Sequence, residues 1–492
     1  MAKKKVIVIG SGFAGLAAAT TLAQQGFEVH LLEKNADFGG RARQLQKDGF
    51  TFDLGPSWYW MPEVFENYFS QFNSSVKEHY DLLRLDPSYA VFFSKEEIFL
   101  VPAALEKLYE LFEREEKGSS AHLKKFLADA EFKYHASMSQ FIHLPCLSVT
   151  EFLDIKILKA ALKMDLFKSI SKDIKKHFKN PRLVQLLEFP VLFLGAKPVD
   201  TPALYSMMNY ADLVLGTWYP MGGMHKIVEG MVKVAKQQGV ILTANENVEK
   251  IEIENGRAKG VISNGKFHAA DAVVAAADYH HVDQHLLEAK YRNYNEAYWK
   301  SRKMAPSCLM FYVGLDKQLQ GLEHHNLFFD APFDLHGEEI YDRPQWPSNP
   351  LFYATCASKT DATVAPAGKE NLVLLIPVAI DLEDNESIRE KYFNIIIQRL
   401  EKLINQSIVP HIISKTSYCL NDYKTDYNSF GGNAYGLANT LSQTAILKPS
   451  IRNKKVSNLY YAGQLTIPGP GVPPSIVSGQ IVAKEVTKLL NK

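Results

Sequence analysis

Cysteine is scarce in this chain, which has four in 492 residues. They lie far apart, at Cys146, Cys308, Cys356 and Cys419, and no two form a CxxC pair. Disulfide frameworks and zinc sites in small modules depend on closely spaced cysteines. We therefore expect reduced, buried thiols of a cytosolic protein and no metal site.

Excess charge is also lacking. The formal net charge is +1, with 22% charged and 46% hydrophobic residues. This balance is typical of globular proteins and gives no global electrostatic reason to expect nucleic acid as a partner. The length suffices for two or three domains, each with its own core.

A membrane-spanning segment is not expected either, although the 28 residues from Val456 to Ala483 carry no charge. This stretch holds four prolines and four glycines, several of them at its centre. Such a helix could not satisfy its backbone in lipid. The pattern instead predicts a strand over Leu459–Ala462, a glycine turn and a helix from about Pro473, where proline is favourable. The segment is uncharged because it is buried against a site and the core.

The N-terminus combines a basic start with an apolar run, as a signal peptide does, but glycines interrupt the run. Lys5–Ile9 predicts a buried parallel strand, Leu16–Gln25 a helix, and Glu28–Glu33 a second strand. Between the first strand and the helix lies the turn Gly10-Ser11-Gly12-Phe13-Ala14-Gly15. Strand, glycine turn, helix, strand and terminal acid together predict a dinucleotide site rather than a signal peptide.

Each conspicuous residue of this unit has a physical role. Gly10 makes the tight turn, Gly12 lets the backbone approach a pyrophosphate, and Gly15 lets helix and strand pack closely. The helix N-terminus offers free N–H groups to phosphate. Glu33 is placed to accept hydrogen bonds from a ribose.

A second glycine pair, Gly39-Gly40, precedes Arg41, whose side chain can reach phosphate. The segment GFTFDLGPS follows at Gly49–Ser57. With the first glycine turn, this pattern resembles the large FAD family that includes amine oxidases and carotenoid desaturases. The resemblance implies FAD as cofactor. No second GxGxxG follows a strand, which favours FAD as the redox centre, reoxidised by something small or membrane-borne.

The block around 219–280 fits the returning part of such a cofactor domain. A helix is expected from the PMGGMH segment to about Gln238, and a buried strand over Ala272–Ala277. Asn255-Gly256 and Asn264-Gly265 predict hairpin turns. By resemblance, the backbone at Val248 meets the adenine.

The chain between about 100 and 205 is helical and basic. Ile155–Arg182 has nine Lys or Arg against two acids. Lysines gather on one face of each of two predicted helices, opposite apolar residues: Lys156, Lys159 and Lys163, then Lys168, Lys172, Lys175 and Lys179. Such helices can lie on an anionic membrane surface, or their lysines can form an ordinary solvated face.

These observations predict an α/β protein. It has a Rossmann-like, three-layer FAD-binding domain with a parallel sheet, a mixed-sheet substrate domain and a helical membrane-facing subdomain. Strand-like runs at Leu309–Val313 and Leu372–Ile376 and a helix over Asp384–Asn405 belong to the substrate domain. The expected boundaries are 1–75, 215–300 and 425–492 for FAD, 76–100 and 301–424 for substrate, and 101–214 for the helical part.

Further motifs narrow the resemblance to the bacterial-type phytoene desaturases. These are FTFDLGPSWYWMP at Phe50–Pro62, GGNAYGL at Gly431–Leu437, Tyr461–Gly463 and PGPGVP at Pro468–Pro473. The resemblance extends the FAD-binding set to Lys34, Gly40, Arg41, Gly55, Pro56, Ser57, Gly463, Gln464, Gly471 and Val472. Gly463 and Gln464 would lie near the pyrophosphate and ribityl chain. The Val472 N–H would meet the flavin ring.

This family resemblance implies that double bonds are introduced into a long linear C40 polyene such as phytoene, held in an apolar tunnel. Aromatic residues after the flavin motif are candidate lining: Trp58, Tyr59, Trp60, Phe65, Tyr68 and Phe69. No catalytic base is nominated, since His225, His280 and His281 fit packing or surface roles. The implied electron acceptor is a quinone or O2, and the implied location is cytoplasmic, at the inner face of the cell membrane.

Alternatives stay open at this point. Within the family they are a 3,4-desaturase of a hydroxylated carotenoid and a flavin-dependent carotene isomerase. Outside it they are an amine oxidase and a non-catalytic carotenoid carrier.

Overall fold

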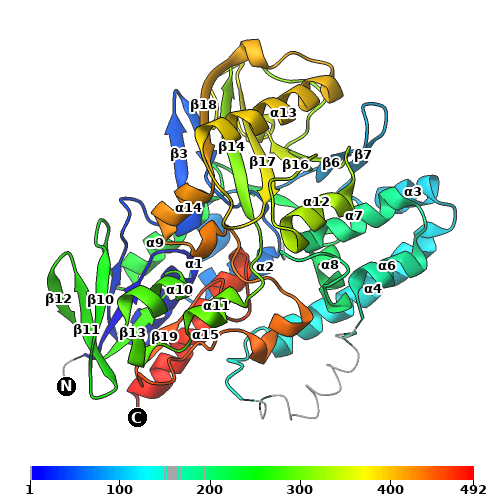
Figure 1. Cartoon of the computed structure of the whole chain (residues 1–492). Coiled ribbons are helices and arrows are strands. Elements are labelled where there is room, and N and C mark those ends of the chain that lie inside the picture. Colours follow the sequence, from blue (N-terminus) through cyan, green and yellow to red (C-terminus); the bar gives the residue numbers. More distant parts are fainter. Residues whose placement is uncertain (1–2, 149–150, 152–163, 166–167, 193–194) are drawn as a thin grey trace.

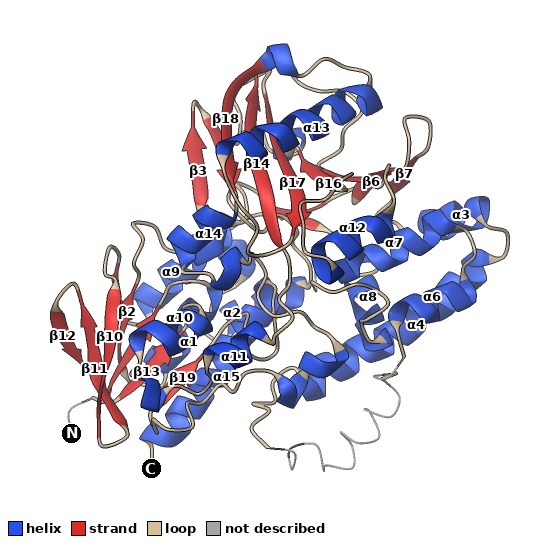
Figure 2. Cartoon of the chain, in the orientation of Figure 1, coloured by secondary structure: helices blue, strands red, loops and turns tan. Residues whose placement is uncertain are grey.

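A computed structural model describes residues 3–148, 151, 164–165, 168–192 and 195–492 (Figure 1). It has three regions: a layered α/β unit that holds both chain ends, a large mixed sheet, and a group of helices (Figure 2).

A five-stranded parallel sheet forms the centre of the first region, in the order β19-β13-β1-β2-β9. Its strands are β1 (Lys5–Ile9), β2 (Glu28–Leu32), β9 (Ile241–Thr243), β13 (Ala272–Ala275) and β19 (Leu459–Tyr461). Alternate residues of β1 face opposite layers, as a strand's period of two requires. Val6 and Val8 pack in one apolar cluster with helices, and Ile7 and Ile9 in another with strands.

Helices from both ends of the chain form one covering layer. α1 (Phe13–Gln24) packs against α15 (Val472–Leu490) and α9 (His225–Gln237). A side chain at Gly479 of α15 would come within 2.2 Å of the Ala14 carbonyl oxygen, so this glycine permits the close helix contact. The uncharged stretch is therefore a strand, a turn and a packed helix, as predicted. Within the described part of the chain, no helix is long and apolar enough to cross a membrane.

A three-stranded antiparallel sheet forms the other layer. It comprises β10 (Val248–Glu254), β11 (Arg257–Ser263) and β12 (Lys266–Ala269). The two hairpin turns fall at the predicted Asn-Gly pairs, where Asn255, Gly256, Asn264 and Gly265 all have positive φ. Helices, parallel sheet and antiparallel sheet give the expected three-layer arrangement.

A seven-stranded mixed sheet forms the second region, in the order β18-β14-β17-β16-β15-β6-β7. The strands are β6 (Tyr89–Phe92), β7 (Ile98–Val101), β14 (Ser307–Leu315), β15 (His325–Phe328), β16 (Phe352–Thr355), β17 (Glu370–Val378) and β18 (Ile412–Tyr418). Only the β15–β6 pair is parallel within this described sheet. The predicted helix is present as α13 (Glu386–Ile404), which buries its apolar face on the sheet.

The third region is helical. Among the residues that the structure describes, its helices are α3 (Leu105–Glu115), α4 (Ser119–Ala136), α6 (Ile170–His177), α7 (Pro181–Leu192) and α8 (Met207–Leu213). In and beside α6, Ile170 and Ile174 are buried, whereas the four lysines of the predicted face are exposed, which confirms the amphipathic pattern there: Lys168, Lys172, Lys175 and Lys179. The other predicted lysine face, Lys156, Lys159 and Lys163, lies outside the described residues.

Shorter elements join the regions. The other α-helices in the described ranges are α2 (Pro62–Ser70), α10 (Tyr279–His281), α11 (Glu296–Lys300), α12 (Phe333–Gly337) and α14 (Leu420–Tyr427). The remaining strands pair as β3 (Gln44–Lys47) with β4 (Phe50–Asp53) and β5 (Leu82–Arg84) with β8 (Trp218–Pro220).

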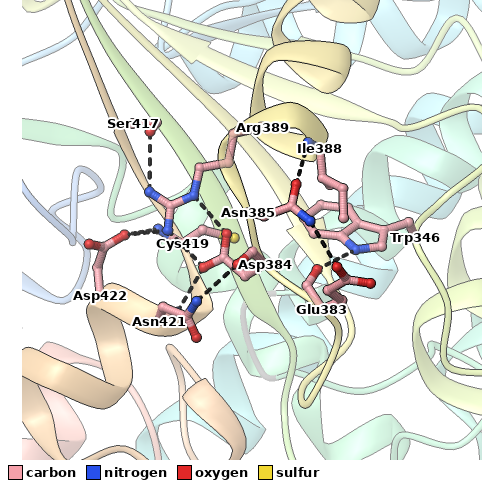
Figure 3. A network of polar contacts seen from close by, with 10 residues as sticks. All are labelled: Trp346, Glu383, Asp384, Asn385, Ile388, Arg389, Ser417, Cys419, Asn421 and Asp422. Atoms are coloured by element: carbon pink, nitrogen blue, oxygen red, sulfur yellow. Dashed lines mark hydrogen bonds and ion pairs between the residues drawn. The ribbon is translucent and has the colours of Figure 1, made fainter.

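A polar network fastens α13 to α14 (Figure 3). The Arg389 guanidinium donates to both oxygens of Asp384 at 2.7 Å and lies 2.7 Å from Asp422 Oδ2. Asp384 also accepts from the Asn421 backbone N–H at 2.8 Å. Asn385 caps α13 by accepting from the Ile388 N–H at 3.0 Å. This network fixes the start of α14, whose later residues line the cavity described next.

Candidate cofactor and substrate site

One cavity of about 820 Å³ runs from the glycine turn after β1 to the mixed sheet and the helical region. Its volume lies in the range of small-molecule and cofactor sites. It contacts all three regions, so residues far apart in sequence share it.

The glycine turn supplies the first wall. Gly10 has φ +94°, which a residue with a side chain rarely adopts. A Cβ built on Gly12 would meet no atom within 4 Å, so this glycine leaves open space in the cavity beside the start of α1. A Cβ on Gly15 would lie 2.0 Å from the Gly10 carbonyl oxygen. Gly15 therefore serves close packing behind the turn and does not line the cavity.

Two helix N-termini reach the same space. α1 begins at Phe13, earlier than the predicted Leu16, and α15 begins at Val472 behind Gly471. Both N-cap residues are glycines, so no side chain accepts from the free N–H groups; in the first turn of α15 only the Val472 N–H is free, because prolines follow at 473 and 474. Uncapped helix N-termini attract anionic or electronegative groups.

Glu33 lies buried at the end of β2. Its carboxylate accepts from the N–H of Ser11 at 2.9 Å, from the Ser11 hydroxyl at 2.6 Å and from the N–H of Asn35 at 2.9 Å. These bonds orient the carboxylate in the cavity wall, where further lone pairs can accept hydroxyl groups. Beside it, burial lowers the pKa of Lys34.

The positively charged side chain of Arg41 lines the cavity. Its guanidinium lies over the Tyr427 ring at 4.9 Å and donates to the Asn433 carbonyl at 3.2 Å. With the Gln464 amide oxygen turned toward it, a further bond of 3.0 Å forms. Arg41 Nε is buried and has no hydrogen-bond partner among the described residues. A buried, unsatisfied guanidinium donor in a cavity wall is suited to a phosphate oxygen.

The structure brings nearly all of the predicted cofactor residues to this cavity. The lining includes Gly10, Ser11, Gly12, Phe13, Ala14, Glu33, Lys34, Gly40, Arg41, Gly55, Pro56, Ser57, Val248, Gly463, Gln464, Gly471 and Val472. Asn35, Tyr427 and Asn428 also line the cavity, although no sequence motif points to them. Asp278, at the end of the strand expected near the nucleotide, and His281, for which the sequence favours a packing or surface role, line it too. Burial lowers the pKa of His281 to about 4.

The prediction for aromatic lining is partly wrong. Trp58 and Trp60 line the cavity, but Tyr59 does not, because alternate side chains of an extended segment face opposite sides. Phe65, Tyr68 and Phe69 instead belong to the core side of α2. The aromatic wall is completed by Phe189 of α7 and by Phe329 and Phe333 near the mixed sheet. Those residues carry no motif in the sequence.

Charged side chains line another part of the cavity, between α6, α7 and α12. They are Lys175, Glu188, Lys197, Asp334 and Glu338. Glu188 is only 4% exposed, and burial raises its pKa. Its Oε1 lies 3.6 Å from Lys175 Nζ and accepts no hydrogen bond within the described part of the chain. This part of the cavity thus contains a buried carboxyl group whose Oε1 is open to a hydrogen-bond donor.

Other candidate chemistry is limited. Within the described ranges, no group of three His, Cys, Asp or Glu side chains could hold a metal ion. All four cysteines are free; Cys308, Cys356 and Cys419 are buried as expected, whereas Cys146 is half-buried and lines the cavity.

Comparison with known proteins agrees with this site. Residues 13–487 match the family of flavin-containing amine oxidoreductases. A carotenoid 3,4-desaturase of Haloarcula japonica is 36% identical over 483 residues, covering 97% of each chain. A ζ-carotene-forming phytoene desaturase of Myxococcus xanthus is 30% identical over 491 residues, covering 98% of this chain and 94% of the relative. Cyclohexylamine oxidase of Brevibacterium oxydans shares the fold, with a TM-score of 0.59, 14% identity and full coverage of both chains.

The chain therefore belongs to the flavin-containing amine oxidoreductase family and, within it, to the carotenoid desaturases. It is an FAD-dependent oxidoreductase that acts on CH–CH bonds of carotenoids. The open space at Gly12 and the unsatisfied Arg41 guanidinium fit this cofactor.

Proposed function

We propose that this desaturase introduces double bonds into a long linear C40 polyene such as phytoene, toward lycopene. The observation that carries the proposal is the continuity of one cavity from the glycine turn to the aromatic wall. FAD, when bound, supplies the acceptor for a hydride from the polyene. The chain's own residues bind, align and shield both molecules.

The proposal assigns the predicted residues to parts of FAD. The turn Gly10–Gly12, the α1 N-terminus and Arg41 hold the pyrophosphate, and Glu33 holds the adenosine ribose. Val248 contacts the adenine. Gly55–Ser57 and the Gly471–Val472 segment hold the flavin end, with Gly463 and Gln464 along the connecting chain. The other predicted residues form the rest of the FAD-binding wall or pack behind it: Ser11, Phe13, Ala14, Gly15, Lys34 and Gly40.

The aromatic wall positions the substrate. A hydrocarbon offers no polar handle, so its alignment depends on the shape of an apolar passage that excludes water. The faces of Trp58, Trp60 and Phe189 can also stabilise positive charge that develops on an allylic carbon.

We further propose that the protein works at the inner face of the cell membrane. A polyene substrate resides in lipid, and the exposed lysines of α6 can contact anionic headgroups. A membrane quinone or O2 then removes the electrons from the cofactor. In this proposal, each of the three sets of residues expected from the sequence has its own function. One set binds FAD, one binds the substrate, and the helical set contacts the membrane.

A second candidate is 3,4-desaturation of a carotenoid that already carries a terminal hydroxyl group. Two observations favour it. The Haloarcula japonica relative, named a carotenoid 3,4-desaturase, has higher identity than the phytoene desaturase. The open acceptor of Glu188 in the cavity suits a hydroxyl donor.

The test is to incubate the FAD-loaded protein with phytoene or with a 1-hydroxylated linear carotenoid in lipid vesicles containing a quinone. Red-shifted polyene bands, resolved by chromatography, are expected, and their positions count the double bonds added. Conversion of phytoene supports the first candidate, and conversion of the hydroxylated substrate alone supports the second. No conversion of either contradicts the proposed function.

A further inference from the structure

Desaturation removes a proton as well as a hydride, and no sequence motif identifies the group that takes this proton. The structure shows a hydrogen-bonded chain at the cavity wall. The Ser57 hydroxyl lies 3.0 Å from the Tyr353 hydroxyl, which lies 2.6 Å from Nδ1 of His325. Ser57 and Tyr353 both line the large cavity, whereas His325 lies behind them and is fully buried.

The mixed sheet fixes this chain of groups. His325 begins β15 and pairs with Thr355 of β16, two residues from Tyr353. His325 and Tyr353 are therefore diagonal neighbours on one face of an antiparallel pair, within reach of each other. The hydrogen bond is thus set by strand register rather than by a loop.

Two further features distinguish His325 from an ordinary core histidine. Its ring stacks on Trp58, with centroids 4.2 Å apart and an interplanar angle of 9°. Its Nε2 is buried without a hydrogen-bond partner among the described residues. A face-stacked indole stabilises an imidazolium ion, so the site can carry a brief positive charge.

A second, small cavity of about 30 Å³ lies behind the wall. Ser57 and Tyr353 line both cavities, and the small one also contains His324 and Asp53. His324 Nδ1 lies 2.7 Å from the hydroxyl of Thr360, which is half-buried. By volume the chamber can hold one or two water molecules, and its walls are polar. Ser57 and Tyr353 connect this chamber to the hydrogen-bonded chain of the cavity wall.

We propose that Tyr353 accepts the proton released from the polyene and passes its own hydroxyl proton to His325. This inference rests on the proposed function. FAD, when bound, would supply the acceptor for the hydride, which is the hydrogen of one C–H bond together with both electrons of that bond. The neighbouring C–H bond breaks, its electrons form the new C=C bond, and its proton goes to the Tyr353 oxygen. Tyr353 ends neutral and His325 becomes an imidazolium, which later returns its proton through the Tyr353 hydroxyl to the small polar cavity that Tyr353 also lines.

The acid–base order supports this route. A carbon next to an allylic cation is strongly acidic, so a neutral phenol held as acceptor suffices. Burial holds the pKa of His325 well below its usual range, so the proton does not remain there. Ser57 acts as a positioning residue that orients the Tyr353 hydroxyl.

The test compares Tyr353→Phe with wild type and with the control Tyr392→Phe. Tyr392 is a buried tyrosine of α13 whose hydroxyl donates to the Pro347 carbonyl at 2.8 Å, outside the cavity. For Tyr353→Phe we expect kcat to fall by about 10²–10⁴-fold, the range for general acid–base groups. KM and FAD affinity should stay at wild-type values, and the melting temperature should fall no further than in Tyr392→Phe, which also loses a buried hydrogen bond. The solvent deuterium isotope effect on formation of the new polyene band should disappear.

If Tyr353→Phe fails to hold FAD, His325→Gln carries the same prediction, because it removes the imidazole from behind an intact tyrosine. An unchanged kcat and isotope effect in either FAD-loaded variant would overturn the relay alone. A wild-type protein that converts neither phytoene nor a hydroxylated carotenoid would overturn the proposed function and the relay with it.

Discussion

Gly12 illustrates how single residues decide this site. Its φ of −64° is open to any residue, and a Cβ there would meet nothing within 4 Å. The protein therefore does not need glycine at this position for its own fold. A pyrophosphate bound in the open space beside the α1 N-terminus needs glycine here, because a side chain would occupy that space.

Substitution at Gly12 separates these two requirements. Gly12→Val should weaken FAD binding by at least about tenfold, which is 1.4 kcal/mol, while the melting temperature of the FAD-free protein stays unchanged. Gly12→Ala should have a smaller effect. FAD fluorescence titration and thermal unfolding measure the two quantities. In contrast, Gly15→Ala should destabilise the FAD-free protein, because its Cβ collides with backbone. A Gly12→Val protein that retains FAD would refute the assignment of this turn.

The stability of the folded protein should depend on pH through the buried Lys448. Burial lowers its pKa to about 7, and its Nζ donates to Asn439 Oδ1 at 2.7 Å. Between pH 7 and the unfolded-state pKa near 10.5, the unfolded chain binds more protons at this lysine than the folded chain. Its destabilising effect is therefore complete below pH 7 and fades as the pH rises.

Lys448→Met removes this proton linkage. Relative to the variant, wild-type protein should gain about 1–3 kcal/mol of unfolding free energy between pH 6.5 and 9.5. Urea unfolding of both FAD-loaded proteins at the two pH values measures the difference. A difference that does not change with pH would show that Lys448 is not a buried, titrating amine.

At the scale of elements, the network of Figure 3 joins helices that serve different purposes. α13 covers the mixed sheet, whereas α14 contributes Tyr423, Asp426 and Tyr427 to the cavity. The Asp384 side chain is fully buried and the Arg389 side chain is 12% exposed. Removing one partner of such a pair leaves the other charge buried without compensation.

Arg389→Met should therefore lower the unfolding free energy by about 3 kcal/mol or more. The matched control is Lys415→Met. It breaks a half-exposed ion pair between Lys415 of β18 and Glu390, which lies next to Arg389 on α13. The control should cost no more than about 1 kcal/mol. Equal losses in the two variants would contradict a special role for the Arg389 network.

Several elements and site residues could be predicted from the sequence, and others could not. Local rules located β1, both Asn-Gly hairpins and the start of α15, because glycine spacing, turn chemistry and proline act within a few residues. They also placed Trp58 and Trp60. They could not find Phe189, Phe329 or the hydrogen bond between Tyr353 and His325. Those contacts depend on strand register and on helix packing between distant segments.

At the scale of the whole molecule, the proposal places the helical region against a membrane. On α6, Lys172 and Lys176 are exposed and do not line the cavity. Each lysine near an anionic surface contributes about 1 kcal/mol of binding. This attraction should weaken as salt screens it.

Charge reversal tests that placement. The double variant Lys172→Glu, Lys176→Glu should bind anionic vesicles about tenfold or more weakly than wild type. The control is Lys402→Glu on α13, the helix that covers the mixed sheet, and it should bind vesicles as wild type does. Co-sedimentation at low and moderate salt measures binding. Equal sedimentation of all three proteins would refute the proposed membrane face.

We propose above all that one cavity holds FAD and a linear carotenoid together. Anaerobic mixing of the FAD-loaded protein with the carotenoid that it converts, without quinone, tests this claim most directly. We predict that flavin absorbance bleaches at the same rate as the red-shifted polyene band appears, with one new double bond for each flavin reduced. New polyene bands with an unbleached flavin, or bleaching without new bands, would contradict the account.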